Sequence, residues 1–299
     1  MISCRTLGAL EVLVDGAPPP PDLKWKKPLA LLLYLAYSPR STRAKDHLIS
    51  LLWPDAKEPN QSLSQAQYLL RTRGGVGIAE KSGQIRLDIT TVVLDTARLE
   101  ALVSKGMWAD AAGLVSGPFL DGFTVRDAPE FEDWISTQRE HWSAKCAEVL
   151  VRYADELTNG GATEQALPVA ERAQGLAPHA DSAEQVRLNA LSLLGRRAEA
   201  LDGYHRFEKR LKVDLGITPD AKTRELVARI TDRPIRPSVP SSKKREPPRR
   251  APLVGRQKQL KRIHDCCVRS RESGEAVLGL VLGEPGSGKT RFVEEVLER

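Results

Sequence analysis

The sequence predicts a mainly α-helical protein with a small β component, built from successive parts. Residues 41–88 follow the pattern helix, turn, helix, short hairpin. A helix-initiating segment recurs after 34 residues in the middle of the chain. Near residue 280 an apolar run leads into the pattern G-x-x-x-x-G-K-T. We therefore expect a winged helix-turn-helix domain (1–92), a helical domain of the tetratricopeptide (TPR) type (93–232), a linker (233–250) and the incomplete start of an α/β P-loop domain (251–299).

Composition is that of an ordinary soluble protein. The 299 residues carry a formal net charge of +6, with 41% hydrophobic and 28% charged residues. No apolar run reaches the ~18 residues of a membrane helix, and no secretion signal opens the chain. The cysteines, Cys4, Cys146, Cys266 and Cys267, lack metal-ligand or redox spacing. We expect a reduced, cytoplasmic setting, no structural metal and no membrane partner.

The N-terminal part is expected to begin with strands. Apolar residues alternate with polar ones from Ile2 to Val14, and Asp15-Gly16 is a turn signal. After a proline-rich connector, Leu29–Tyr37 predicts the buried first helix of the domain. Residues 1–90 hold 12 basic and 8 acidic side chains, a positive balance that suits a phosphate partner.

Two further helices are expected in this domain. The first should begin at Ser41-Thr42, which are helix-capping types, and end at Trp53, before a proline. The second should run from about Ser62 to Arg73, where Gly74-Gly75 ends it. Its buried face is predicted from apolar residues at helical spacing, namely Leu63, Ala66, Leu69 and Leu70.

The other face of the second helix carries hydrogen-bonding side chains. Gln and Arg can pair with base edges in the major groove, and Ser, Thr and Tyr can donate to phosphates. A hairpin over residues 78–87, with a turn-rich tip at Glu80–Gly83, would place two cations beside the DNA backbone. The alternative is a small helical core whose polar face meets only water. The expected DNA-binding residues are Ser64, Gln65, Tyr68, Arg71, Thr72, Arg73, Lys81 and Arg86.

From Leu94 onward the pattern predicts helices throughout. Asp127, with Pro129 behind it, signals the start of a long helix with one largely apolar stripe. Thr218-Pro219-Asp220 should cap a last helix that ends near Ile230.

A repeat lies within this helical part. Residues 161–167 align with residues 195–201, at the tetratricopeptide period, and residues 106–112 are an irregular third copy. Stacked helix pairs of this kind generally bind proteins or self-associate. A plain helical bundle without a partner is the alternative interpretation.

The C-terminal part combines a linker with a phosphate-binding motif. Residues 233–250 hold five prolines and seven basic residues, so we expect a disordered linker. In the motif that follows Val277–Leu282, backbone N–H groups close around phosphates, the lysine reaches the β and γ phosphates, and the threonine binds Mg²⁺. The expected nucleotide-binding residues are Gly283, Gly286, Ser287, Gly288, Lys289 and Thr290, with Thr290 also the Mg²⁺ ligand.

The P-loop is expected to be incomplete. No acidic Walker B strand follows it before Arg299, so we expect a fragment of a longer protein or a truncated gene. We therefore expect this chain not to be an enzyme, and ATP with Mg²⁺ to be cofactors only if further sequence completes the module. The histidines sit singly, without a nucleophile or carboxylate arrangement around them.

Six segments carry a resemblance to a known family: Leu7–Val12, Asp46–Trp53, Ser62–Ala66, Arg196–Tyr204, Leu215–Pro219 and Leu253–Arg256. With its parts in this order, the chain resembles the SARP family of bacterial antibiotic regulatory proteins. The resemblance implies a response-regulator-type winged helix followed by a bacterial transcriptional activator domain (BTAD) and, in larger members, a STAND-like ATPase. It implies tandem binding to direct repeats in double-stranded promoter DNA, self-association there, and recruitment of RNA polymerase.

The sequence departs from the family pattern at the second helix. The family usually places several arginines toward the end of this helix, where this chain has Arg71, Thr72 and Arg73. We therefore expect weak, strongly salt-sensitive binding unless copies bind cooperatively. Two other functions stay open: an ATP-dependent STAND-type switch, and a TPR-type adaptor without specific DNA binding.

Overall fold

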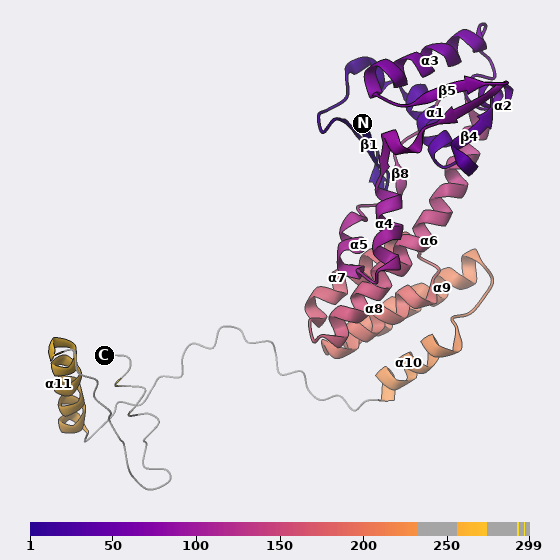
Figure 1. The fold of residues 1–299 in the computed structure, drawn as a ribbon. Helices are drawn as coiled ribbons and strands as arrows, with labels where there is room; N and C mark the ends of the chain where they lie inside the picture. Colours follow the sequence, from indigo (N-terminus) through magenta and orange to yellow (C-terminus); the bar gives the residue numbers. More distant parts are fainter. Residues whose placement is uncertain (233–255, 274–291, 293–295, 297–299) are drawn as a thin grey trace. The chain divides into compact units, whose positions relative to one another are not determined.

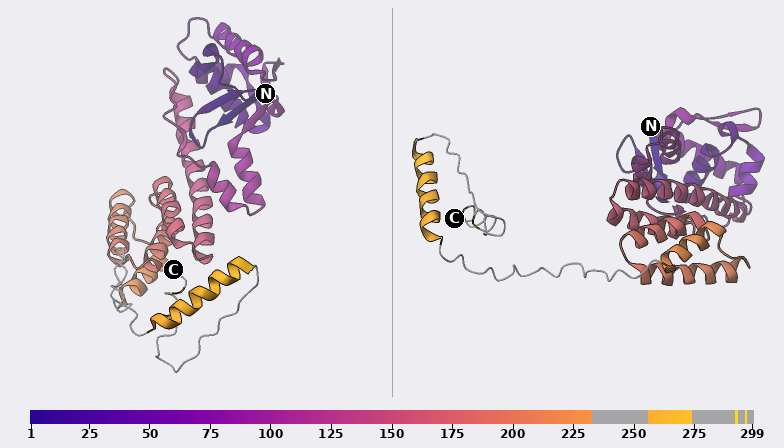
Figure 2. Two further views of the ribbon diagram at one scale, coloured as in Figure 1. Left: turned by 90° about the vertical axis from the view of Figure 1, so that its left-hand side faces the viewer. Right: turned by 90° about the horizontal axis from the view of Figure 1, so that it is seen from below.

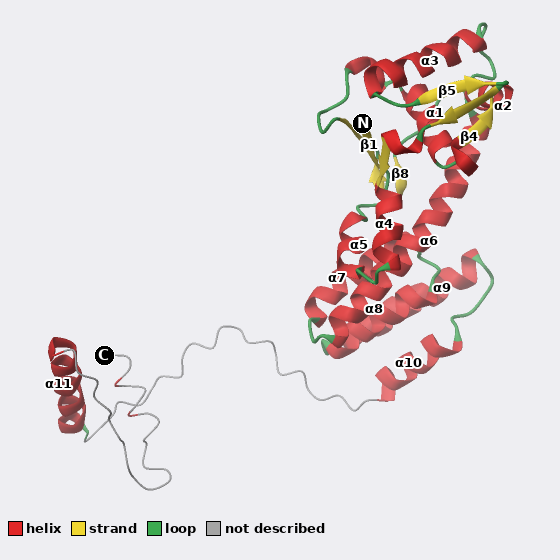
Figure 3. Cartoon of the chain, viewed as in Figure 1, coloured by secondary structure: helices red, strands yellow, loops and turns green. Residues whose placement is uncertain are grey.

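The protein is described here from a computed structural model, which defines residues 1–232, 256–273, 292 and 296. Its contacts divide the chain into two units, Met1–Pro234 and Ile235–Arg299. In the described part of the first unit, every strand precedes residue 122 and helices make up the rest (Figure 3). In the second unit the main described element is helix α11, Gln257–Ser273.

The chain opens with a sheet that brings distant segments together. Strand β1 (Ile2–Arg5) pairs antiparallel with β3 (Glu11–Val14) and parallel with β7 (Val92–Leu94). The expectation of strands at the start of the chain is confirmed. Because β7 leads directly into the helical part, this sheet lies at the junction of the two predicted domains.

The winged helix-turn-helix follows. Helices α1 (Lys26–Ala36), α2 (Lys45–Leu52) and α3 (Pro59–Gly74) pack on one another, with apolar side chains buried between them. Figure 1 shows α3 lying across the top of this domain. The wing is an antiparallel sheet in the order β4-β6-β5, and short 3-10 turns lie at Pro21–Lys24 and Pro39–Ser41. Its strands are β4 (Thr42–Ala44), β5 (Ile78–Lys81) and β6 (Gln84–Leu87).

Three expectations for this domain need correction. The expected helix start at Ser41-Thr42 is wrong, because Thr42 begins strand β4 and α2 starts at Lys45. Helix α3 begins three residues earlier than expected, at Pro59, a residue suited to the first helical turn. The hairpin tip is also shorter: Ser82 and Gly83, with φ angles of 52° and 70°, form the two-residue turn.

Residues 95–232 form helices packed side by side, and Figure 2 shows their successive layers. The long helix α6 runs from beside α2 into this stack, where it packs on α5, α7 and α8 (Figure 1). None of the helices in the described ranges has the length and apolar character of a membrane span. The elements are α4 (Asp95–Ser104), α5 (Trp108–Leu114), α6 (Pro129–Asn159), α7 (Thr163–Leu176), α8 (Asp181–Leu193), α9 (Arg197–Asp214) and α10 (Ala221–Asp232).

The repeated segments occupy equivalent places in the stack. Gly161 and Gly195 both have positive φ angles, 80° and 73°, just before a helix begins. Ala166 and Ala200, five residues after each glycine, are both fully buried. Asp220 caps α10 as expected, since its carboxylate accepts a hydrogen bond from the Thr223 N–H at 2.6 Å.

The expectation of helix throughout from Leu94 is wrong at one place. Residues Phe119–Asp121 form strand β8, which pairs in parallel with β2 (Gly8–Ala9). A three-residue strand of this kind depends on a partner more than 100 residues away, so the local pattern carries little sign of it.

A buried carboxylate ties the two parts of the first unit together. Asp95, at the start of α4, accepts hydrogen bonds from the backbone N–H groups of Thr6 and Leu7 at 2.7 and 2.8 Å. It also accepts from the Thr6 hydroxyl at 2.7 Å and from the Thr96 N–H at 3.0 Å. The Tyr37 hydroxyl, from the end of α1, lies 2.9 Å from the hydroxyls of both threonines. Every polar group here has a partner, which fixes α4 against the N-terminal sheet.

An aromatic cluster makes a second connection between these parts. The rings of Tyr34 on α1 and Trp134 on α6 meet edge to face, with centroids 5.1 Å apart. Tyr37 and Phe119 meet in the same way at 5.3 Å. One continuous cluster of buried apolar residues therefore extends from the first strand into α8. The cluster's rings are those of Tyr34, Tyr37, Phe119, Phe131, Trp134 and Trp142.

Candidate DNA-binding surface

Helix α3 is held rigidly at both ends and along its inner face. Pro59 supplies a preset φ at the N-terminal turn, and Gly75 ends the helix in the left-handed conformation with φ 62°. The apolar residues expected on the inner face, Leu63, Ala66, Leu69 and Leu70, are all buried. The outer face of α3 can therefore serve as a fixed platform.

A stripe of six exposed residues runs along that outer face, and we call it the α3 stripe. It consists of Gln61, Ser64, Gln65, Tyr68, Arg71 and Thr72. Their spacing of three and four places them on one side of the helix. Tyr68 is 58% exposed, unusually so for a large aromatic residue. Within the described residues, Gln65, Tyr68 and Arg71 have no side-chain partner, so their polar groups are available to a ligand.

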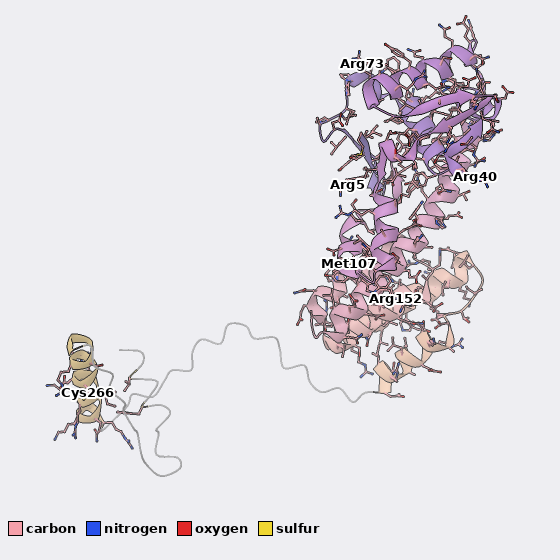
Figure 4. The ribbon with its side chains drawn as sticks, viewed as in Figure 1. Arg5, Arg40, Arg73, Met107, Arg152 and Cys266 are labelled. Carbon is pink, nitrogen blue, oxygen red and sulfur yellow. The ribbon has the colours of Figure 1, made fainter. Side chains whose placement is uncertain are left out.

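Arg73 does not belong to the stripe. It lies about 140° around the helix from Tyr68. Its Nε donates to the Asp22 carboxylate at 3.0 Å, and Figure 4 labels it near the end of α3. Thr72 stays on the stripe, but its hydroxyl donates to the Tyr68 carbonyl at 2.8 Å. Of the two arginines predicted on α3, the structure leaves only Arg71 free on this face.

The wing carries its predicted cations with two acids close by. Arg86 is exposed on the outer face of the sheet, opposite Ala79, and Lys81 lies beside the turn. Glu80 forms an ion pair with Lys45 at 3.0 Å. Hydrogen bonds from the Thr90 hydroxyl and N–H lower the pKa of Asp88. Because this carboxylate stays ionised close to Arg86, it weakens the attraction of that cation for phosphate.

A pocket of about 510 Å³ borders the α3 stripe, and we call it the flank pocket. Its walls come from α3, from the start of α1 and from residues 125–127, just before α6. Gln65 belongs to both the stripe and the pocket. Among its lining residues are three cations, one acid and a half-exposed indole: Lys26, Lys27, Arg126, Asp127 and Trp25.

Contacts with α6 fix the loop that delivers Arg126. The Arg139 guanidinium donates to three carbonyls of this loop, those of Phe119, Leu120 and Phe123, at 2.8 to 3.1 Å. The Val125 N–H donates to the Glu132 carboxylate at 2.6 Å. Arg126 itself is exposed and has no partner among the described residues. The helical part therefore presents a cation beside the predicted recognition helix.

The cations of the flank pocket were not among the predicted site residues. Lys26 and Lys27 stand in a visible basic run, Lys24 to Lys27, yet no local pattern brings them to Gln65. Arg126 belongs to the other predicted domain, and only the packing of α6 against the winged helix places it there. The basic run was the only sequence signal available.

The predicted nucleotide-binding residues, Gly283–Thr290, lie outside the described residues, as does the linker at 233–250. Where the structure is described, no three His, Cys, Asp or Glu side chains are grouped to hold a metal ion.

Comparison with known proteins identifies the helical part. Residues 94–231 match the family model of the bacterial transcriptional activator domain. No curated protein sequence matches the chain. A solved structure, "Mycobacterium tuberculosis EmbR in complex with low affinity phosphopeptide", is similar in fold: its TM-score is 0.60 at 22% identity, covering 92% of this chain and 72% of that one. Residues 94–231 are therefore a bacterial transcriptional activator domain, and the chain shares its fold, a winged helix followed by a helical domain, with that solved structure.

Proposed function

We propose that the protein is a transcriptional activator that binds promoter DNA through α3. The observation that carries this proposal is the α3 stripe: a rigid helix presents unpartnered amide, hydroxyl and guanidinium groups on a winged helix joined to an activator domain. These are the groups that hydrogen-bond base edges and phosphates.

In this account α3 enters the major groove with its stripe facing the bases. Arg71 would donate two hydrogen bonds to a guanine, and Gln65 would pair with an adenine edge. Tyr68 and Ser64 would donate to phosphates or bases nearby. Because Arg73 is held by Asp22 and Asp88 lies close to Arg86, few cations on these elements are free to contact the backbone. We therefore propose binding as neighbouring copies on direct repeats, which compensates for a weak single contact.

We propose that the helical domain contacts RNA polymerase or a neighbouring copy. A groove of about 840 Å³ lies in this domain between α6, α8 and α10. Arg152, Lys222 and Arg229 line it together with Glu148, Asp155 and Glu225, and burial raises the pKa of Asp155. The same groove favours the adaptor as a second candidate function. Control by ATP and Mg²⁺ at Gly283–Thr290 stays a prediction, since those residues are not described.

Selection from a pool of random duplexes tests the DNA-binding proposal. The full chain should enrich a motif present as direct repeats. The variant Arg71→Ala should lose the enrichment while its circular dichroism stays unchanged, because Arg71 is exposed and its side chain makes no hydrogen bond or ion pair within the described structure. Arg98→Ala, at an exposed position of α4 outside the groove of the helical domain, should enrich the same motif as the parent. A parent protein that enriches no sequence would contradict the proposal.

A further inference from the structure

The flank pocket brings positive charge to the side of α3, in addition to the cations of the wing. Lys26, Lys27 and Arg126 line the pocket against a single acid, Asp127. In the hairpin, Asp88 lies close to Arg86, while Glu80 pairs with Lys45. A double helix next to the α3 stripe would therefore be attracted to the pocket as well as to the wing.

We propose that the flank pocket binds a backbone phosphate of the DNA strand that borders the groove entered by α3, through Lys27 and Arg126. This inference rests on the proposed DNA binding. It adds that the activator-domain side of the chain takes part in DNA binding directly, because Arg126 lies within residues 94–231.

Three features of the pocket fit a phosphate. Lys27 and Arg126 have no acidic partner among the described residues, so neither must give up an ion pair. Helix α1 begins at the pocket without a side-chain cap and without an acid in its first turn, so the N–H groups of Lys26 and Lys27 have no partner within the helix. Gln65 joins the pocket to the α3 stripe, so one ligand can reach both surfaces.

The pocket is also fixed in shape, as a phosphate clamp requires. Lys26 spans its two walls: its Nζ donates to the Thr124 hydroxyl at 3.4 Å and lies 6.0 Å from the centre of the Phe123 ring. Trp25, at the mouth, is 54% exposed. Its indole would lie against the sugar-phosphate chain and report on the arrival of DNA.

The salt dependence of DNA binding tests the proposal. The full chain, Lys27→Ala, Arg126→Gln and Arg126→Lys are titrated with a fluorescent duplex between 50 and 300 mM salt. Loss of one phosphate contact should reduce the slope of log K against log salt by about 0.9. We expect this reduction for Lys27→Ala and Arg126→Gln, on specific and scrambled duplexes alike. Arg126→Lys should keep the parental slope, because a phosphate accepts either cation.

Two controls separate this inference from the proposed function. Arg98→Ala removes an exposed arginine of α4 that lines neither the pocket nor the groove of the helical domain, and it should leave the slope unchanged. Asp127→Asn removes the only acidic residue of the pocket and should strengthen binding to both duplexes. If Arg71→Ala abolishes sequence preference while the Lys27 and Arg126 variants keep the parental slope, the pocket proposal is overturned and the function stands. Absence of any DNA binding by the parent overturns both.

Tryptophan emission gives an independent readout. DNA should quench the emission of the parent, and Trp25→Phe should remove most of that change while binding persists. An equal change in Trp25→Phe would place the DNA away from the pocket and count against the proposal.

Discussion

Asp95 is the single residue on which the junction between the two domains most depends. It is buried, and its carboxylate satisfies three N–H groups and one hydroxyl from two distant segments. The arrangement uses almost the full accepting capacity of a carboxylate. Removing one oxygen would leave a buried donor without a partner.

Asp95→Asn should therefore lower the free energy of unfolding by about 3 kcal/mol, because an amide cannot accept all four bonds and brings two donors of its own. Urea denaturation would measure it. Asp133→Asn, at an exposed position of α6, should change stability by less than about 0.5 kcal/mol. Equal effects of the two substitutions would show that the Asp95 network adds little.

Two buried thiols should make stability fall in alkaline solution. Burial, with the nearby charge of Asp95, raises the pKa of Cys4 and of Cys146 from 9.0 to about 12. In the unfolded chain both thiols ionise near pH 9, so above that pH the unfolded state holds fewer protons than the folded state. The free energy of unfolding must then decrease as pH rises from 9 toward 12.

The comparison to make is the urea midpoint at pH 8 and at pH 10, for the parent and for the double variant Cys4→Ala, Cys146→Ala. The parent should lose more stability over this interval than the variant does, whatever their absolute values. Identical losses would mean that the thiols are not the titrating groups.

At the residue scale the sequence predicted side-chain exposure better than side-chain partners. The α3 stripe follows from helical spacing, and all its members are exposed. The pairing of Arg73 with Asp22 joins residues 51 positions apart, and nothing local predicts it. The cations of the flank pocket were not predicted either, because they come from segments about 100 residues apart.

At the scale of elements, the packing of α8 against α9 depends on one glycine. Arg187 of α8 is buried and bonds the fully buried Glu184 at 2.6 and 3.1 Å. A Cβ atom at Gly203 of α9 would come within 1.8 Å of the Arg187 guanidinium. Because Glu184 holds the guanidinium in place, this arginine has little freedom to move away.

Gly203→Ala should lower the free energy of unfolding by about 3 kcal/mol, even though alanine favours helices. The matched control is Gly175→Ala in α7, where nothing lies within 4 Å of the new Cβ. That substitution should raise the free energy of unfolding by about 0.5 to 1 kcal/mol. A stabilised Gly203→Ala variant would contradict the packing described here.

Helices were easier to predict than strands. Helix α6 and the equivalent starts of α7 and α9 follow from periodicity and from glycine spacing over many residues. Strands β4 and β8 have three residues each and exist because β6 and β2 offer partners. The start of α2 was predicted wrongly from capping residues alone, because Thr42 pairs with Arg86 in the sheet instead of capping a helix.

At the scale of the whole molecule, the winged helix and the activator domain form one compact unit through residue 234. The Asp95 network and the aromatic cluster both cross their junction. All five tryptophans lie within this unit, so their fluorescence reports on it alone. The orientation of α3 relative to the helical stack is therefore fixed by the fold. A fixed orientation would set the spacing of copies that bind side by side on DNA.

Urea unfolding of the parent, followed by tryptophan fluorescence, should show a single transition. Trp134→Ala removes the ring that joins Tyr34 to Phe131 and should separate this transition into two. Trp108→Ala removes an indole outside the cluster and should leave one transition. Two transitions already present in the parent would show that the domains unfold independently.

The central claim is sequence-specific DNA binding by α3, and one measurement tests it most directly. Fluorescence anisotropy would follow binding of the full chain to DNA from the region upstream of its own gene, and to a scrambled duplex, over a salt series. We predict a steep salt dependence with clear preference for the native duplex, and loss of that preference in Arg71→Ala. Equal affinity of the parent for both duplexes would contradict the claim and leave the helical domain, acting as an adaptor, as the functional part.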